Sequence, residues 1–196
     1  MRGAAGLLLA LALCIPARDA LADNEIIRLD ASRSHAGFRV KLVWLLGVDG
    51  RFGTVDGTVA VDPFRNQLRV DARIAVDSLR MARASQERWA KSAEFFDAER
   101  HPDIHFVSEP FPRARLAAGG ELRGELTVRG VRQSVRFELQ PSDCVRPAFD
   151  CPIRVDGSIR RSRFGMDAHR GTLSDRVELD FTVYAHPGAS GVAAPG

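Results

Sequence analysis

The chain has 196 residues, of which 45% are hydrophobic and 27% charged, enough for one domain with a sizeable core. Its 28 basic and 25 acidic side chains give a net charge of +3, and the two signs alternate along the sequence. This distribution is typical of a mixed-charge surface. It argues against nucleic-acid binding, which usually requires a clustered basic stripe with interleaved aromatic residues.

The N-terminal segment has the order of a signal peptide. Arg2 precedes the apolar run 4–15, and residues 20–22 have the A-x-A form of a cleavage site. A retained anchor is the weaker interpretation, because the run holds about a dozen residues and a spanning helix needs about 20. A lipid anchor on Cys14 is also disfavoured, because the residue before it is too bulky for the usual lipoprotein motif. We expect cleavage of residues 1–22 and export to the periplasm.

The sequence after this segment is dominated by alternation of apolar and polar residues, which is the side-chain period of a β-strand with one buried face. About eight such runs occur, separated by Gly, Pro and Asp, and no βαβ pattern interrupts them. They predict an all-β domain over residues 23–187, with antiparallel strands closed into a barrel or stacked as a sandwich. A barrel is favoured because closure removes exposed strand edges.

Two segments depart from the alternation. Residues 78–96 are rich in helix formers, so we expect one helix there, whose stripe of Trp89, Ala93 and Phe96 caps an end of the barrel. Residues 188–196 contain Ala, Gly, Ser, Val and Pro and are expected to form a disordered tail.

Cys144 and Cys151 are the two cysteines that remain after cleavage of the signal peptide. In an exported protein an even number of cysteines favours a disulfide, and the six residues between them include Pro147, which can turn the chain back. A metal pair is the alternative. It is disfavoured because no histidine lies nearby to complete a zinc site.

The sequence offers little to support catalysis. His101 and His105 form the closest histidine pair, but Pro102 between them prevents the helical i, i+4 arrangement of metal ligands. A weak site including Asp103 on a strand is the alternative, and exposed histidines are commoner. No nucleophile elbow, phosphate-binding glycine loop or cofactor-binding cysteine motif is present. We expect neither catalytic residues nor a metal or cofactor, and an unrecognised enzyme is the least favoured function.

Several motifs, taken in order and spacing, resemble the YceI-like family of periplasmic lipocalin-type proteins over residues 26–185. They are Leu29-Asp30 with Ser34-His35 and Phe38, the segment 50–57 with Phe52, residues 92–97 running into 101–106, residues 124–131, and residues 161–166 with Ser174-Asp175. One departure is Arg163, which stands where the family usually has an acid.

The resemblance implies an extended, eight-stranded, antiparallel, lipocalin-like barrel whose lumen holds a long isoprenoid chain, such as a polyprenyl lipid or a quinone. It implies a binding or carrier protein. An exported stress-response or interaction module without a transported ligand is the alternative. Transient contact with a membrane or with membrane quinone proteins, and a homodimer, are further expectations.

The candidate ligand contacts are the apolar side chains expected to face inward. They are Phe38, Val40, Leu42, Trp44, Phe52, Val59, Phe96, Phe106, Phe137, Phe164 and Phe181. Each could instead belong to a packed core, because an eight-stranded barrel can be filled by side chains alone. Glycines of inward parity, such as Gly57, Gly124 and Gly157, suggest unfilled lumen volume or a bent strand. Candidate polar anchors for a head group at the mouth are His35, Arg160, Arg161 and His169.

Overall fold

The computed structural model describes residues 25–42 and 46–192, so the predicted signal peptide and Trp44 lie outside the described residues. The strands are β1 (Glu25–Leu29), β2 (His35–Leu42), β3 (Leu46–Phe52), β4 (Val55–Asp62), β5 (Gln67–Ala75), β6 (Leu79–Met81), β7 (Asp103–Ser108), β8 (Phe111–Pro112), β9 (Gly120–Val128), β10 (Val131–Leu139), β11 (Ile153–Arg160), β12 (Leu173–Val183) and β13 (Ala185–Val192). The helices are α1 (Ala84–Lys91) and α2 (Arg115–Ala118), and the 3₁₀ turns are η1 (Val76–Ser78) and η2 (Arg161–Phe164).

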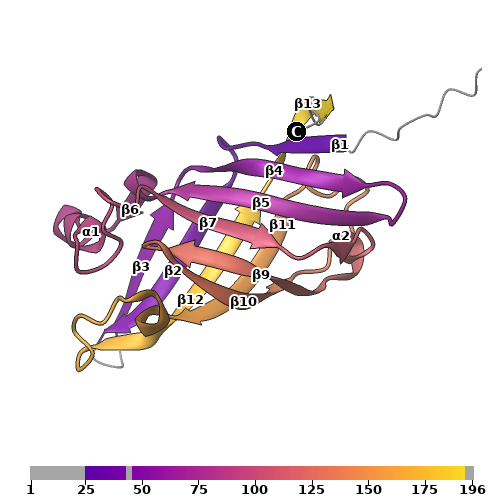
Figure 1. The fold of residues 1–196 in the computed structure, drawn as a ribbon. Helices are drawn as coiled ribbons and strands as arrows, with labels where there is room; N and C mark the ends of the chain where they lie inside the picture. The colour runs from indigo at the N-terminus through magenta and orange to yellow at the C-terminus, as the bar shows by residue number, and fades with distance from the viewer. Residues whose placement is uncertain (1–24, 43–45, 193–196) are drawn as a thin grey trace, which may run out of the picture.

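The strands form one curled antiparallel sheet in the order β13-β1-β4-β5-β7-β9-β10-β11-β12-β2-β3-β6, with β8 paired to β5. Figure 1 shows β4, β5, β7, β9 and β10 lying across the molecule and β2, β3, β11 and β12 running steeply behind them. The sheet therefore wraps around an interior between two crossing layers. The two-residue turn Arg129-Gly130 joins β9 to β10 with positive φ at both residues, as a type I′ hairpin requires.

The predicted fold class is confirmed, and two details of it were wrong. The described residues contain thirteen strands rather than eight, because five further segments, β1, β3, β6, β8 and β13, join the sheet beside the predicted runs. The strand order also ends at β6 and β13 instead of closing as a continuous ladder. At one corner the chain passes directly from β3 to β4, and Gly53 N–H donates to the Ser78 carbonyl at 3.2 Å. A second hydrogen bond of 3.2 Å, from Ala75 N–H to the Thr54 carbonyl, joins the same two segments of the chain.

The helix predicted over residues 78–96 is much shorter in the structure. Leu79 is fully buried and pairs with Phe52 of β3, so residues 79–81 are drawn into the sheet as β6. At the other end, extended Ser92 terminates α1. Ala93 is consequently exposed and does not join the predicted stripe, whereas Ala90 is buried. The second helix, α2, is too short to produce a periodic sequence signal.

The tail predicted to be disordered was also wrong for residues 188–192. These residues belong to β13, whose Val192, Gly191 and Ser190 pair with residues 25–27 of β1. Ladder hydrogen bonds come from the backbone, so a Gly- and Ala-containing segment can pair without the apolar alternation on which the prediction depended. Residues 193–196 lie outside the described residues.

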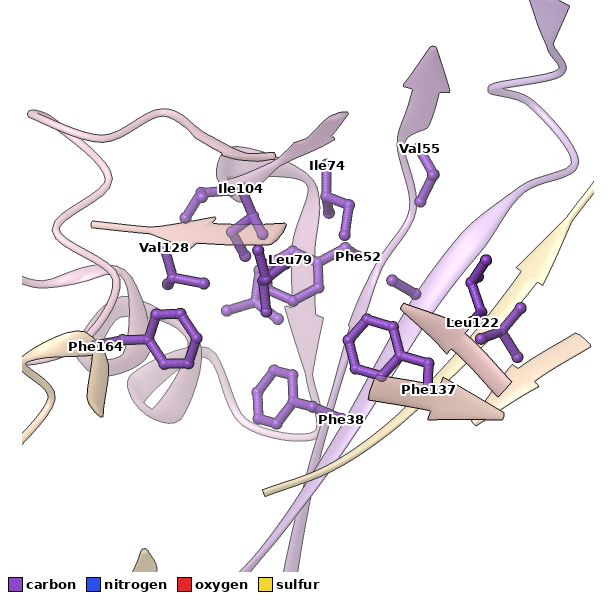
Figure 2. Packing of buried hydrophobic residues seen from close by; sticks show 14 of the residues in the cluster. Phe38, Phe52, Val55, Ile74, Leu79, Ile104, Leu122, Val128, Phe137 and Phe164 are labelled. Carbon is purple, nitrogen blue, oxygen red and sulfur yellow. The ribbon is translucent and has the colours of Figure 1, made fainter. Parts of the chain in front are cut away.

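The inward face carries the apolar side chains that the alternation predicted. One buried cluster includes residues of β2, β4, β5, β7, β9, β10 and β11. Figure 2 shows Phe38, Leu79 and Phe164 grouped in one part of this interior, with Phe137 and Leu122 in another. Cross-strand pairing, such as Val59 with Val70, places residues of equal parity on this face.

The Cys144–Cys151 disulfide is present, with 6.4 Å between the two Cα atoms. It closes the β10–β11 connection into a compact loop. Within the loop the guanidinium of Arg146 donates to both carboxylate oxygens of Asp150 at 2.9 and 2.6 Å.

Candidate functional site

The interior of the curled sheet contains two apolar chambers. The larger has a cavity volume of about 460 Å³ and is lined by residues of β4, β5, β7, β9, β10, β11 and β12. One part of its boundary is formed by α2 and the disulfide-closed loop, from which Leu116 and Phe149 line the cavity. Binding pockets for small molecules have volumes of roughly 300–1,000 Å³, so this chamber has the size of a ligand site.

The smaller chamber has a cavity volume of about 140 Å³ and lies beneath α1. Its wall comes from β2, β3 and β12, and its cover includes Trp89 and Ala90 of α1 with Phe95 and Phe96 just beyond the helix. An apolar cavity of about 150 Å³ can hold one benzene molecule, so this chamber accommodates a group about the size of one ring or one branched isoprene unit.

The chambers are adjacent and share part of their walls. Ile74 of β5, Leu126 of β9 and Phe181 of β12 line both cavities. A chain that entered one chamber and passed these three side chains would therefore reach the other. The arrangement suits an elongated ligand better than a compact one.

Phenylalanine rings occupy the spaces that inward-facing glycines leave. A Cβ atom added to Gly157 would lie 2.3 Å from a ring carbon of Phe137, and one added to Gly50 would lie 2.3 Å from the ring of Phe38. These glycines pair directly with the two phenylalanines across the sheet. The rings therefore lean sideways over neighbouring strands and leave the middle of the lumen open.

At Gly124 and Gly157 the predicted unfilled volume is taken by the ring of a neighbouring phenylalanine, so these glycines contribute to the open lumen through the tilt of that ring. At Gly124 the Phe106 ring and the Val107 carbonyl take the space, with nearest approaches of 2.6 and 2.4 Å to an added Cβ. Gly57 has another role, because its φ of +141° lets β4 approach β5 within 2.1 Å of where a Cβ would lie.

Aromatic contacts connect the residues of each chamber. Phe52 and Phe96 meet edge to face with ring centroids 5.4 Å apart, and Phe38 lies within 6.0 Å of both. In the larger chamber, Phe137 lies 5.4 Å from both Phe106 and Phe181. Such pairs contribute about 0.5–1.5 kcal/mol each beyond the burial of their surface, so they hold the walls in place.

The structure places nine of the eleven predicted apolar contacts in the chamber walls. Those in the smaller chamber are Phe38, Val40, Leu42, Phe52, Phe96 and Phe181, and those in the larger are Val59, Phe106, Phe137 and again Phe181. Phe164 lies in η2, where it is buried, and lines neither chamber. Trp44 lies outside the described residues.

Arg161 is a structural residue and not a free anchor. Its side chain is buried and donates to the carbonyl oxygens of Met166, Ala168, Leu173 and Ser174. Burial lowers the pKa of the guanidinium, which nevertheless stays charged because arginine titrates far above neutral pH. Although Arg161 lines the smaller chamber, its donors are committed to carbonyl oxygens of the loop after η2 and of the start of β12.

The other predicted anchors do not converge on a chamber mouth. His35 is half-buried on β2, where burial and the nearby Arg51 guanidinium lower the pKa of its imidazole. His169 packs 5.1 Å from the Trp89 ring outside the chamber and lies 3.5 Å from the Glu94 carboxylate. Arg160 is exposed and lines a polar groove on the outer face.

The polar residues at the larger chamber were not predicted. Arg113, after β8, and Arg146, in the disulfide-closed loop, supply the charges in its wall. They lie in irregular segments, so no strand parity indicated their direction. Pro147 and the two flanking cysteines were the sequence signals that this loop folds back.

The described residues contain no group of three or more His, Cys, Asp or Glu side chains arranged to hold a metal ion. His105 Nε2 lies 2.7 Å from a carboxylate oxygen of Asp71 on the adjacent strand, as a surface pair. His101 instead faces Gly130 in the β9–β10 turn. Within the described part of the chain, no helix is long and apolar enough to cross a membrane.

A family model described as the YceI-like domain matches residues 28–185, which include nearly all residues that line the two chambers. The chain belongs to the YceI-like family. Among curated relatives, a UPF0312 protein of Photorhabdus laumondii is 27% identical over 181 residues, covering 86% of this chain and 88% of the relative. Protein YceI of Salmonella arizonae is 26% identical over 168 residues, covering 80% and 84%.

Solved structures share the fold of this YceI-like domain. BcnA of Burkholderia cenocepacia superposes with a TM-score of 0.65 at 20% identity, covering 79% of this chain and 98% of BcnA. A polyisoprenoid binding domain from Saccharophagus degradans gives a TM-score of 0.61 at 14% identity, covering 83% and 98%. These similarities, at 20% and 14% identity, establish a shared fold.

Proposed function

We propose that this YceI-like domain binds a long apolar ligand of the isoprenoid class, a polyprenyl lipid or an isoprenoid quinone, along its two chambers. The pair of adjoining apolar chambers carries the proposal. The structural relative from Saccharophagus degradans that is described as polyisoprenoid binding supports the same class of ligand. The domain then acts as a binding or carrier protein.

The apolar chamber walls indicate that affinity depends on the length of the ligand's apolar chain more than on its head group. Burial contributes roughly 25 cal/mol per Å² of apolar surface, so about 400 Å² of enclosed chain gives about 10 kcal/mol before the costs of ordering are subtracted. Few polar groups line either chamber. Affinity should therefore rise with each isoprene unit until the space is filled.

We place this function in the periplasm, after cleavage of residues 1–22. The proposal rests on the order of charge, apolar run and small residues at the N-terminus, and the disulfide is compatible with an oxidising compartment. A carrier of such a ligand must meet a membrane, or a protein in one, at least briefly when it loads and unloads.

A chain-length series tests the proposal. Trp89 lines the smaller chamber, so the intrinsic tryptophan fluorescence, to which Trp44 also contributes, should report occupancy as the protein is titrated with geraniol, farnesol, geranylgeraniol and solanesol. We expect saturable binding at a 1:1 ratio, with dissociation constants that fall along the series and then level off. The absence of saturable binding for every prenol would refute the proposal.

A matched pair of variants locates the bound chain. Val59→Asp puts an unpaired charge into the larger chamber, which should weaken binding of the longest prenols most. Glu138→Lys changes an exposed residue on the outward side of β10 and should leave the titration unchanged. Equal effects of the two variants would show that the chain binds elsewhere.

A further inference from the structure

One end of the molecule is formed by three loops that hydrogen bonds join together. They are the β4–β5 turn with the residue before it (62–66), the segment that contains α2 (113–119) and the disulfide-closed loop (140–152). Arg113 N–H donates to the Asn66 carbonyl at 3.0 Å, and Ser142 N–H donates to the Ala117 carbonyl at 2.9 Å. Figure 1 shows the β4–β5 turn and α2 at the same end of the molecule. We call the surface of these three loops the mouth end.

The larger chamber reaches solvent at the mouth end. Arg113, Val145 and Arg146 line this chamber, and all three residues are exposed. A residue that borders the cavity and also contacts water marks an opening, so the loops surround an entrance to the chamber. The half-buried Leu116 and Phe149 line the same chamber, so apolar surface continues from this entrance inward.

The two most exposed large hydrophobic side chains in the described part of the chain belong to the mouth end. Val145 of the disulfide-closed loop is 95% exposed, and Phe64 at the β4–β5 turn is 78% exposed. The α2 segment, which is bonded to both loops, exposes three small apolar residues, Ala114, Ala117 and Ala118. Single exposed hydrophobic residues are common on protein surfaces, but here they are grouped around the entrance to an apolar cavity.

Both large side chains are held outward by fixed loops. A carboxylate oxygen of Asp62 accepts the backbone N–H of Phe64 at 3.0 Å, which fixes the turn. Val145 lies in the loop closed by the disulfide, where Arg146 and Asp150 also pair. Neither loop can fold its apolar side chain inward without breaking these bonds. The two side chains therefore remain in water until another apolar phase covers them.

The charges of the mouth end do not oppose contact with phosphate groups. Its three loops contain four arginines and three aspartates. Asp62 and Asp150 are each paired with an arginine of their own loop. Within the described residues, the exposed guanidinium of Arg113 has no carboxylate at contact distance. Arginine side chains are thus available beside the apolar ones.

We propose that the mouth end docks on the surface of a phospholipid bilayer, with Phe64 and Val145 inserted among the acyl chains and arginines at the level of the phosphates. Binding to such a surface grows with the apolar area inserted and with attraction between basic side chains and anionic lipid. A side chain exposed on nearly all sides, as Val145 is, can be surrounded by fluid lipid but offers little flat surface to a folded protein.

The inference rests on the proposed function for the cargo, and it deepens that function by naming the partner and the face that meets it. Docking would place the entrance of the larger chamber against the lipid. An apolar ligand would then pass between bilayer and chamber without crossing water, which removes the cost of exposing its chain.

The first test measures partition onto vesicles of phosphatidylcholine and phosphatidylglycerol that contain no prenyl lipid. The exported protein is used after removal of residues 1–22, because the apolar run 4–15 would itself bind lipid. We expect the wild-type protein to float with the vesicles. Phe64→Ser combined with Val145→Ser should lower the partition coefficient at least about tenfold, since two apolar side chains no longer leave water.

A matched control uses exposed hydrophobic residues outside the mouth end. Leu46 at the start of β3 is 63% exposed, and Val131 at the start of β10 is 36% exposed. Leu46→Ser combined with Val131→Ser should leave the partition coefficient within about twofold of the wild-type value. An equal loss in this control would indicate general apolar attraction to the vesicles and would overturn the docking face.

A second test reports which side chains enter the lipid. Phe64→Trp and Val145→Trp are each compared with Leu46→Trp on vesicles whose acyl chains carry bromine, a quencher of tryptophan fluorescence. We expect the added tryptophan to be quenched at positions 64 and 145 and to remain unquenched at position 46. Equal quenching at all three positions would contradict insertion of the mouth end.

The outcomes separate this inference from the proposed function. Absence of wild-type protein from the floated vesicles overturns the docking and leaves the chamber proposal standing, because the prenol titration contains no bilayer. Sedimentation without vesicles tests a second copy as the occupant. A dimer that Phe64→Ser and Val145→Ser together abolish would show that this surface is covered by another chain, which also overturns the docking. A protein that binds vesicles through the mouth end but no prenol supports the docking and defeats the proposed function.

Discussion

At the scale of single residues, Arg161 shows how a buried charge can be structural. Its guanidinium donates to four carbonyl oxygens of the segment after η2, so replacement by Met would leave these acceptors without their donor. We expect Arg161→Met to lower the free energy of unfolding by about 3 kcal/mol, which urea denaturation would measure. Arg154→Met, at an exposed position on β11, is the control and should change stability by less than about 0.5 kcal/mol.

The lowered pKa of His35 predicts a pH dependence of the free energy of unfolding. Burial and Arg51 lower the pKa of its imidazole in the folded protein below the ordinary 6.5, while Asp180 acts in the opposite direction. The unfolded chain therefore binds the proton more readily, and this contribution to stability is present above pH 6.5 and lost as the pH falls below it. His35→Gln should flatten the dependence of unfolding free energy on pH between 5 and 7. An unchanged slope in this variant would contradict the assignment.

Residue roles were harder to predict than residue positions. Alternation along the strands correctly directed Phe38, Phe106 and Phe137 to the lumen, because parity fixes the face of a strand. The roles of Arg161 and Phe164 depend on how the η2 segment folds back. Nothing in the local sequence pattern specifies which carbonyls a guanidinium will find.

At the scale of elements, the disulfide-closed loop forms part of the wall of the larger chamber. Its Cys144–Cys151 pairing was predicted from the sequence and is present in the structure. Replacing Cys144 and Cys151 together by Ser should reduce stability by about 2–3 kcal/mol, because a short loop closure is lost from the unfolded chain. Chemical denaturation of the variant measures this loss. Thiol titration of the unreduced, unfolded wild-type chain should find neither cysteine free, and two reactive thiols would contradict the pairing.

Element boundaries depended on long-range pairing that sequence periodicity does not report. Leu79 and Met81 lie beside good helix formers in the sequence, but backbone pairing with β3 places them in the edge strand β6. The β10–β11 ladder is similar, because alternation along both strands predicts pairing that continues to Val135 and Ile159, whereas the ladder consists of the three pairs from Phe137–Gly157 to Leu139–Val155. In both places tertiary contacts decided between local structures of comparable propensity.

At the scale of the whole molecule, the curled sheet does two things at once. Its inner face joins two apolar chambers through Ile74, Leu126 and Phe181, and its outer face keeps the alternating charges that made the sequence recognisable as a mixed-charge surface. The fold class followed from alternation and from the family resemblance. The division of the lumen did not, because it depends on rings such as Phe137 leaning over glycines of neighbouring strands.

The most direct test of ligand binding is mass spectrometry of an organic extract of the full chain, purified without detergent from a bacterial host. We expect a prenyl lipid at close to one molecule per protein, retained by Glu138→Lys and lost from Phe137→Asp, which places a charge in the larger chamber. An extract of the wild-type protein without any prenyl lipid, or an equal yield from Phe137→Asp, would contradict a lumen that holds an isoprenoid chain.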